Sequence, residues 1–353
     1  MKWYLHPISV TFFVMAFIVT LPLLLSHKRV TPLTDKALIK SALSRNIIPI
    51  PTTLKALQLF YHDKNLTSEK IALGKALFFE KLLSKDKTIS CSSCHKLKEG
   101  GDDNLPTAIG YHQLKNPSHL NTPTVLNVAL ATSFFWDGRA SSLKEQAKGP
   151  IQAPFEMNMP ISEIEKRINN TIKYKKAFHT LYHKTYISFE DIVKSIALYE
   201  KTLLTRSTFD TFLEGNISAI NQQAKRGFHL FLTAGCSGCH SGIALGGQSV
   251  QKFPLRNYLF DYIGLNSLSS FKNSPFPFKN KGNFLGRGNQ LKFRVPLLRN
   301  ITKTAPYFHN GSVKKLEEVI KIMGKYQVGI DFNTTQIDDI MEFFKTLEGK
   351  LIK

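Results

Sequence analysis

The sequence predicts a mainly α-helical protein of two domains, preceded by an apolar N-terminal segment. Three observations predict this class. The chain has 353 residues, of which 42% are apolar and 21% charged, so it can bury a large core and favours about two domains. Helix-period patterns and capping signals recur along the chain, whereas alternating strand patterns are scarce. Finally, the pattern Cys-x-x-Cys-His occurs once in each half.

The N-terminal segment, residues 1–30, contains eighteen uncharged residues from Ile8 to Leu25. This is just long enough to cross the hydrocarbon of a bilayer. The following residues, LLLSHKRV, make a poor cleavage site, so we favour an uncleaved transmembrane anchor over a cleaved signal. In both cases the body of the protein is expected in the periplasm, and an anchor would hold it at the inner membrane. The net charge of +21 therefore argues for an anionic membrane surface or an acidic protein partner, and no nucleic acid is expected.

Residues 31–65 are expected to form a tether, with one short helix between about Val30 and Pro51. The N-terminal domain is assigned to 66–208 and the C-terminal domain to 209–353, and the last helix could pack back on the N-terminal domain. Thr67 or Ser68 is expected to cap one helix, and Ser188 begins a capping-box pattern. The expected helices are 69–79, 188–204, 218–232, 313–323 and 335–347.

The two pentapeptides use all four cysteines of the chain. They consist of Cys91, Cys94 and His95, and of Cys236, Cys239 and His240. This is the attachment pattern of c-type haem. Two cysteines one helical turn apart can form thioethers with the vinyl groups of one porphyrin, and the histidine that follows supplies an axial nitrogen to the iron.

Other uses of the two cysteine pairs are weaker. A zinc site would have to pool both pairs across a very long loop and ignore the histidines. A thioredoxin-like dithiol needs a βαβ context that this sequence lacks. Chance could explain one copy, but two copies in an exported chain favour haem. The predicted fold class is thus two c-type cytochrome domains, each with one covalently bound haem.

The sixth ligand of each iron determines function, because a methionine suits electron transfer and an open position suits chemistry. Outside the N-terminal segment and the apolar face of the last helix, the methionines are Met157, Met159 and Met323. Core packing is the commoner role of a lone methionine. Met323 stands out because it ends a predicted helix just before Gly324, where the chain can loop over a haem.

The chain resembles the bacterial di-haem cytochrome c peroxidases, a family related to the tryptophan-tryptophylquinone maturation enzyme. The resemblance extends from about Leu66 to Gly349. It is carried by the two pentapeptides and by the stretches LGKALFFEKLLSKDKTISCSSCHKL, GGDDNLPTAIG, NTPTVLNVA, FFWDGRASSLKEQAKGPIQAPFEM and FRVPLLRNITKTAPYFHNGSVKKLEEVIKIMGKYQVG.

The resemblance implies a role for each half. The haem of Cys91, Cys94 and His95 would react with peroxide, and the haem of Cys236, Cys239 and His240 would receive electrons. Met323 matches the methionine ligand of the second haem, where the quinone-maturation enzyme has tyrosine.

The resemblance also implies roles for residues around the haems. Trp136 matches an electron relay between the haems, and Glu156 matches the carboxylate over the peroxidatic iron. Asn121, with the carbonyls of Thr304 and Pro306, matches a site for one Ca²⁺. From sequence alone, Trp136 could equally be core, Glu156 a surface residue and Asn121 a turn residue.

One position departs from the family pattern. Relatives often have a histidine after the glycine that aligns with Gly110, and this histidine caps the peroxidatic iron in the resting enzyme. Here Tyr111 occupies that position. His112 could be the sixth ligand with a shift of one residue, and His119 is a weaker candidate. We favour the third alternative, an iron that nothing caps.

The expected function is reduction of hydrogen peroxide to water with electrons from a small periplasmic cytochrome c or a cupredoxin. Between residues 251 and 315 there are twelve Lys and Arg and one acid, Asp261, so an acidic donor is expected. Two alternatives remain: a membrane-tethered di-haem electron carrier, and an oxidase of the same fold that acts on another substrate. Glu156 and Met323 favour the peroxidase. The natural donor and the oligomeric state, including a homodimer, stay open.

Overall fold

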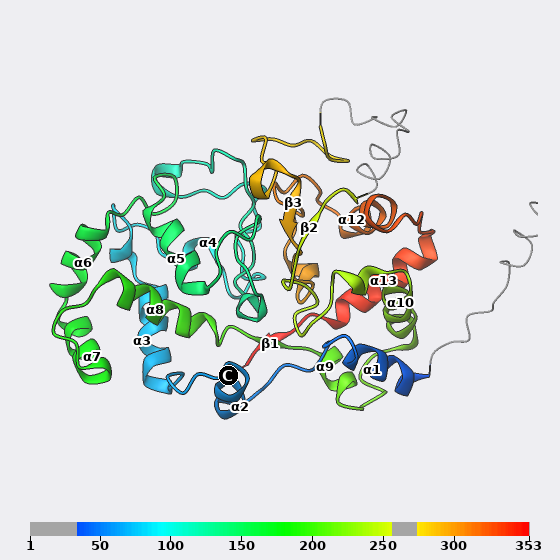
Figure 1. The fold of residues 1–353 in the computed structure, drawn as a ribbon, viewed down its shortest axis with the longest axis horizontal. Helices are drawn as coiled ribbons and strands as arrows, with labels where there is room; N and C mark the ends of the chain where they lie inside the picture. The colour runs from blue at the N-terminus through cyan, green and yellow to red at the C-terminus, as the bar shows by residue number, and fades with distance from the viewer. Residues whose placement is uncertain (1–33, 256–273, 353) are drawn as a thin grey trace, which may run out of the picture. The chain divides into compact units, whose positions relative to one another are not determined.

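Helices form both halves of the chain, as the sequence predicts. The computed structural model describes residues 34–255 and 274–352. Within this part, Figure 1 shows α3 to α8 on one side and α9, α10, α12 and α13 on the other, with β1 between them. The helices are α1 Asp35–Leu43, α2 Leu54–Phe60, α3 Ser68–Phe78, α4 Cys91–Cys94, α5 Leu143–Gln152, α6 Ile161–Asn169, α7 Ile172–Tyr182, α8 Phe189–Glu200, α9 Thr208–Leu213, α10 Gln222–Thr233, α12 Leu316–Met323 and α13 Thr334–Thr346. The strands are β1 Thr205–Arg206, β2 Val250–Lys252, β3 Lys292–Arg294 and β4 Lys350–Leu351.

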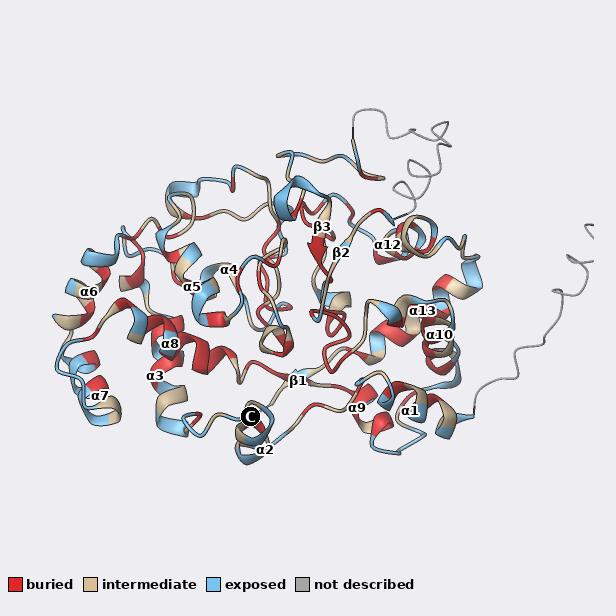
Figure 2. Ribbon diagram, in the orientation of Figure 1, coloured by how far each residue is buried: buried red, intermediate tan, exposed pale blue. Residues whose placement is uncertain are grey.

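Each half is built on one pair of helices whose backbones touch at a glycine. A Cβ on Gly74 of α3 would lie 2.1 Å from the carbonyl oxygen of Ser195 in α8. A Cβ on Gly227 of α10 would lie 1.8 Å from the carbonyl oxygen of Asp339 in α13. Only glycine permits such close approach. Figure 2 shows buried residues along α8 and around β3.

Aromatic side chains fill the core of the second half. Phe209, Phe228 and Phe343 form a triangle with ring centroids 4.9 to 5.3 Å apart. Phe231 adds a ring 5.3 Å from Phe343. Such tilted and edge-on contacts add to the free energy of burial. These contacts pack α9, α10 and α13 against one another.

The ends of the described helices agree closely with the predictions, with three exceptions. One is the helix expected over 188–204, which ends at Glu200. Thr67 caps α3, and Ser188 forms the predicted capping box with Asp191 at α8. The helix expected from residue 218 begins at Gln222, because Asn221 accepts the N-terminal hydrogen bond. The helix expected from residue 313 begins at Leu316, because Val313 is taken into a β-bridge with Tyr307.

Residues before the first pentapeptide belong to the folded body. Residues Asp35–Lys353 form one compact unit. The one short helix expected between about Val30 and Pro51 is α1, which packs on α10 and buries Leu38 and Ala42. A second helix, α2, follows within the 31–65 segment. Ile50 then donates its N–H to Asp210 Oδ1 at 2.9 Å. From Asp35 onward the segment is therefore packed against the second half.

The C-terminus returns to the first half through a strand. Helix α13 packs mainly on α10 and α12. After it, β4 pairs with β1 in antiparallel register, with Thr205 opposite Leu351, and Leu351 packs against the hydrophobic core of the first half. The second small sheet pairs β2 with β3, with Val250 opposite Arg294.

The predicted membrane anchor, residues 1–30, lies outside the described residues. Among the residues that are described, none of the helices has the length and apolar character needed to cross a bilayer.

The structure contains an internal repeat: the backbone features of residues 121–143 occur again at equivalent positions in residues 294–316. Asn127 and Asn300 are both left-handed, with φ of 61° and 62°, and each precedes a short 3₁₀-helix. Phe135 and Phe308 both have φ of 66°. Each run then begins a helix, α5 or α12. The left-handed residues and the helix starts thus fall at equivalent positions without insertion, although Ala305–Pro306 is a cis peptide and its counterpart Thr132–Ser133 is not.

The two repeats meet at the hydroxyl of Thr205 in β1. Asn127 and Asn300 each donate Nδ2 to Thr205 Oγ1 at 2.8 Å. Their side-chain oxygens accept the backbone N–H of Thr205 at 2.9 Å and of Gly349 at 2.7 Å. All three side chains are buried, so this junction holds β1, β4 and both repeats together.

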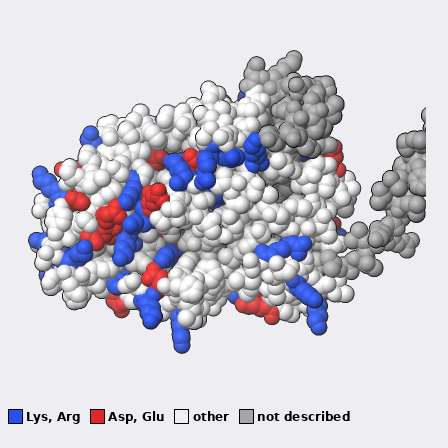
Figure 3. All heavy atoms as spheres, viewed as in Figure 1, with Lys and Arg blue, Asp and Glu red and all other residues white. Residues whose placement is uncertain are grey.

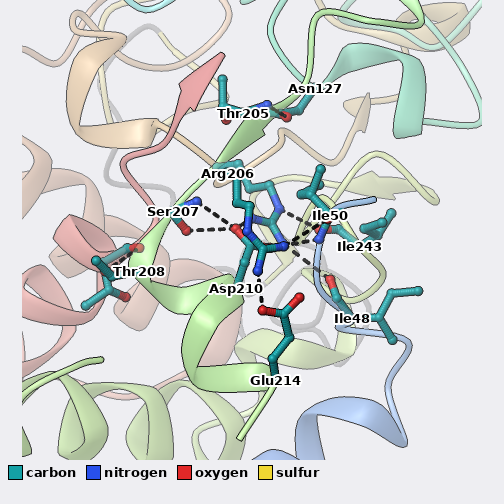
Figure 4. A network of polar contacts seen from close by, with 12 residues as sticks. Ile48, Ile50, Asn127, Thr205, Arg206, Ser207, Thr208, Asp210, Glu214 and Ile243 are labelled. Carbon is teal, nitrogen blue, oxygen red and sulfur yellow. Dashed lines mark hydrogen bonds and ion pairs between the residues drawn. The ribbon is translucent and has the colours of Figure 1, made fainter. Parts of the chain in front are cut away.

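A fully buried ion pair lies next to the junction. Arg299 donates two hydrogen bonds to the Asp210 carboxylate, both at 2.9 Å, and neither side chain is exposed. Figure 4 shows that Asp210 also accepts from Ser207 and from the backbone of Ile50. Burial alone would raise the pKa of Asp210, but the Arg299 charge and these hydrogen bonds lower it overall. The stabilisation is therefore present above the unfolded carboxyl pKa of about 4 and is lost as the pH falls below it.

Substitution Asp210→Asn is expected to lower the free energy of unfolding by about 3–5 kcal/mol, because it leaves the Arg299 charge buried without a partner. Urea denaturation followed by circular dichroism measures this. The matched control is Glu214→Gln, which breaks a more exposed ion pair with Arg206 and should cost at most about 1 kcal/mol. Equal losses in the two variants would contradict the assignment.

Candidate functional site

The first pentapeptide forms one short helical turn. Helix α4 consists of Cys91–Cys94, and Ser90 and Ser93 cap it reciprocally. His95 ends the turn and donates its N–H to the Cys91 carbonyl at 3.0 Å. Both cysteines are free and half-buried. The two thiols and the following imidazole are therefore carried by one short turn of the chain.

The second pentapeptide repeats this arrangement. Helix α10 leads through Gly235, which has φ of 97°, into the 3₁₀ turn Cys236–Gly238. His240 donates its N–H to the Cys236 carbonyl at 2.9 Å, as His95 does to Cys91. Cys236 and Cys239 are also free and half-buried.

Both histidines are oriented by a backbone carbonyl. His95 Nδ1 lies 3.1 Å from the oxygen of Gly101, and His240 Nδ1 lies 3.1 Å from the oxygen of Leu245. A carbonyl accepts only, so Nδ1 carries the proton and Nε2 keeps a free lone pair. Burial lowers the pKa of both rings, that of His240 to about 4, so both are neutral at pH 7. Neutral imidazole with a fixed tautomer is what an iron ligand requires.

The structure does not gather the four cysteines into a zinc site. Across the described residues, which include all four, no three side chains of His, Cys, Asp or Glu lie close enough to hold a metal ion. The residues therefore fit two separate haems, each with two thiols and one imidazole, better than one tetrahedral metal centre.

Glu156 lies beside the first pentapeptide. It follows α5, and its carbonyl accepts the N–H of Tyr111 at 2.7 Å. Gly110 packs on it so closely that a Cβ there would lie 2.6 Å from the Glu156 Cα. Cys94 Sγ lies 3.7 Å from the oxygen of Ile109 in the same loop, and the pKa of Cys94, raised to about 12 mainly by burial, also responds to Glu156.

The carboxyl group of Glu156 is poised to exchange a proton near neutral pH. Burial raises its pKa to about 7, and the Arg139 charge opposes this rise in part. A half-buried carboxyl of this pKa suits general acid–base catalysis.

Trp136 connects the two halves. Its indole Nε1 donates to the carbonyl of Asn121 at 2.8 Å, and its own carbonyl accepts the N–H of Arg294 at 2.8 Å. The Asn121 N–H in turn donates to the His309 carbonyl at 2.8 Å. Since Asn121 matches Arg294 and Trp136 matches His309 in the internal repeat, each half contacts the other through the same backbone positions.

His309 and Arg294 were not predicted as site residues. His309 is 3% exposed and lies among the rings of Phe276, Phe284 and Phe293, and burial lowers its pKa to about 4. Aligning 121–143 with 294–316 would have identified both residues, because it pairs Arg294 with Asn121 and His309 with Trp136.

The predicted calcium residues Asn121 and Pro306 lie together. Asn121 is 5% exposed, and its side-chain amide contacts the Pro306 carbonyl oxygen at 2.5 Å. Thr304 is half-buried two residues earlier.

Met323 ends α12 as predicted, and Gly324 follows it. The chain then forms the π-helical turn Gly324–Val328, a rare conformation that often occurs at functional sites. Val328 Cγ1 would lie 3.7 Å from a Cβ on Gly235, so this turn passes the second pentapeptide. A cavity of about 520 Å³ borders the same pentapeptide. Its lining is Arg45, Asn46, Leu232, Gly235, Ser237, Gly238 and Ser241.

The loop that departs from the family pattern presents Tyr111 and His112 differently. Tyr111 is half-buried against Glu156, whereas His112 is exposed at the loop tip with φ of 52°. Their rings stack with centroids 3.9 Å apart. His119 is half-buried with φ of 48°.

Comparison with known proteins identifies relatives over most of the chain. The family model described as di-haem cytochrome c peroxidase matches residues 68–218. Cytochrome c551 peroxidase of Nitrosomonas europaea is 40% identical over 285 residues, 78% of this chain and 79% of that protein. The protein of the same name from Pseudomonas aeruginosa is 36% identical over 326 residues, 91% of this chain and 89% of that protein. A solved MauG-like protein associated with microbial copper homeostasis is 27% identical with a TM-score of 0.68, covering 81% of this chain and 91% of that one.

The fold and the two attachment turns define a c-type cytochrome with two haems and a carboxyl group at one of them. With relatives of this identity and coverage, the chain belongs to the di-haem cytochrome c peroxidase family. The predicted resemblance is confirmed.

Each pentapeptide is expected to attach one haem independently. In a host competent for cytochrome maturation, intact mass spectrometry should show two haems on the wild type. The double substitutions Cys91→Ala with Cys94→Ala, and Cys236→Ala with Cys239→Ala, should each leave one haem. Ser237→Ala, in the second turn, should keep both. Wild-type protein without added mass would contradict the haem assignment.

Proposed function

We propose that the protein reduces hydrogen peroxide to water in the periplasm, with electrons from a small redox protein. The observation that carries this proposal is the half-buried carboxyl of Glu156, with a pKa raised to about 7, beside the first haem-attachment turn. The relatives named cytochrome c551 peroxidase support it. An electron carrier would have no use for a carboxyl group placed in this way.

Bound haem would supply the redox chemistry, namely the two electrons that reduce peroxide to water. The protein's part is to move the proton. Glu156 takes a proton from the peroxide oxygen nearer the iron and returns it to the outer oxygen, so that water departs rather than hydroxide. His95, neutral and fixed through Nδ1, would hold the iron through Nε2.

Met323 would supply a thioether ligand to the iron that His240 holds. Its position at the end of α12, with the Gly324–Val328 turn passing Gly235, supports this role. A thioether raises the reduction potential, which suits a haem that receives electrons. Trp136 then relays electrons towards the first haem, and its hydrogen bond to Asn121 fixes the ring. At the first iron we retain the uncapped alternative, because His112 is exposed.

Substitution Glu156→Gln should lower peroxide turnover by about 100-fold or more, because the amide cannot take up a proton. The wild-type kcat/KM should rise with pH and level off above about 7, where the carboxyl is ionised. Stopped-flow oxidation of a reduced cytochrome measures both, and the haem spectrum should stay unchanged.

Glu318→Gln, on the exposed face of α12, is the matched control and should keep wild-type turnover. Undiminished turnover in Glu156→Gln would exclude the proton-transfer role. A wild type with two haems but no peroxide turnover would instead favour the electron carrier, or an oxidase of the same fold with another substrate.

A calcium ion is proposed between Asn121, Thr304 and Pro306. Calcium takes oxygen ligands from amides and carbonyls. The Asn121 amide faces the Pro306 carbonyl, and rotation of the amide by half a turn would present its oxygen beside that carbonyl. Since Asn121 also accepts the Trp136 indole, an ion here would rigidify the connection between the haems.

Chelation of calcium is expected to lower turnover, and added calcium should restore it. Isothermal titration of the chelated protein should show one site, which Asn121→Ala weakens at least tenfold through loss of its ligand oxygen. Asn283→Ala, at an exposed turn, should bind as the wild type does. Equal binding by both variants would reject the site.

The donor is proposed to be an acidic small cytochrome c or cupredoxin. Figure 3 shows Lys and Arg side chains gathered in the region of β2 and β3. Two cations of the 251–315 stretch, Arg294 and Arg299, are buried and do not belong to this surface. Its exposed members among the described residues are Lys279, Lys281, Arg287, Lys303, Lys314 and Lys315.

Donor turnover should fall steeply as salt rises, because ions screen attraction between opposite charges beyond about 10 Å at 0.1 M. Steady-state kinetics with an acidic cytochrome at increasing ionic strength measure this. Charge reversal at Lys281 and Lys315 should flatten the dependence, whereas reversal at Lys176 in α7 should not. Kinetics independent of salt would argue against this surface.

Two further predictions stay open. Membrane fractionation tests whether residues 1–30 anchor the protein to the inner membrane, and light scattering tests whether it forms a homodimer.

A further inference from the structure

Arg294 is a buried cation that lacks a counter-charge among the described residues. It is 4% exposed, and its Nε donates to the Phe135 carbonyl at 3.2 Å. Its Nη1 has no hydrogen-bond partner in the described part of the chain. Arg299, five residues later, differs because both its Nη atoms bond the Asp210 carboxylate. An unsatisfied buried donor costs about 1–3 kcal/mol, and an unpaired buried charge costs more.

The position of Arg294 places it at the second haem site. It lies in β3, two residues before Pro296, whose carbonyl interacts with the His240 ring. Its backbone N–H donates to Trp136 at 2.8 Å. Burial lowers the pKa of the guanidinium to about 10, so the side chain is still charged at pH 7. The segment that carries Arg294 therefore contacts both Trp136 and the His240 ring, and its guanidinium is held at the carbonyl of Phe135, next to Trp136.

We infer that Arg294 binds a propionate carboxylate of the haem attached at Cys236 and Cys239. Each haem carries two carboxylates, and the guanidinium fork matches a carboxylate in both geometry and charge. The unpartnered Nη1 would then donate to a propionate oxygen. This inference rests on the proposed function, since it requires the second haem.

The internal repeat offers a second argument, because it relates Arg294 to a residue of the first half. Arg294 matches Asn121, the residue proposed to hold calcium. Both residues also donate their backbone N–H to the opposite repeat, at 2.8 Å in each case. In the first repeat, Asn121 would bind a calcium ion through its amide oxygen. In the second repeat, the positive charge at the same position is the guanidinium of Arg294.

A positive charge next to a haem favours the reduced state, because reduction adds one negative charge. Loss of the Arg294 charge should therefore lower the reduction potential of the second haem. We expect the ratio of reduced to oxidised haem at a fixed potential to fall about tenfold, which corresponds to about 59 mV for one electron.

The test is spectroelectrochemical titration of the purified di-haem protein in the wild type and in Arg294→Gln. The matched control is Arg287→Gln. Arg287 donates to the carbonyls of Asp137 and Gly138 in the same loop, but its side chain is exposed. The control should keep the wild-type potential. A potential equal to the wild type in Arg294→Gln, with both haems attached, would overturn the inference.

Arg294→Lys covers the case in which Arg294→Gln does not fold. Lysine keeps the charge but not the fork, so the potential should shift less, while the propionate bands in the redox-difference infrared spectrum should move. Unchanged bands would overturn the inference, since a purely structural arginine has no contact with the propionate. Haem content and peroxide turnover are measured on the same samples. Absence of the second haem in the wild type would refute the proposed function, whereas two haems with an unmoved potential would refute only the role of Arg294.

Discussion

The hydroxyl of Thr205 is the point on which the arrangement of the two halves depends. It accepts a hydrogen bond from Asn127 and another from Asn300, and all three residues are buried. Both asparagines adopt the left-handed conformation, which asparagine tolerates better than most residues. Each therefore satisfies a backbone group and a side chain at once. An aliphatic replacement would leave buried donors and acceptors without partners, which is costly in an interior of low dielectric.

This junction explains how two repeats produce one site. Asn127 and Asn300 bond the same hydroxyl, that of Thr205. Further along each repeat, the carbonyl of Trp136 or His309 accepts a backbone N–H from the other repeat. The equivalent positions have diverged in chemistry: tryptophan corresponds to histidine, and asparagine to arginine. The symmetric backbone thus carries an asymmetric set of side chains, and the asymmetry lies between the two haem-attachment turns. The proposed division of roles, with peroxide chemistry at one haem and electron entry at the other, would require such a difference.

Much of this could be predicted from the sequence because the strongest signals are local. The pentapeptides, the capping box at Ser188 and the glycine after Met323 each act within one turn of chain, and the structure has them as predicted. Prediction failed where tertiary contacts decide. Val313 has an apolar helical pattern, yet Tyr307 draws it into a bridge. Helix α5 was missed because it contains Gly149 and Pro150, which ordinarily end helices. Arg294 looked like one more surface cation, since sequence does not reveal burial.

The two ends of the folded region are exchanged between the halves. Helix α1, near the beginning, packs on the second half, while β4, near the end, completes the sheet of the first half. Synthesis runs from the N-terminus, so β1 lacks its partner strand until the final residues have emerged. A cut between the halves would therefore separate β1 from β4 and would leave each half without an element that it packs against.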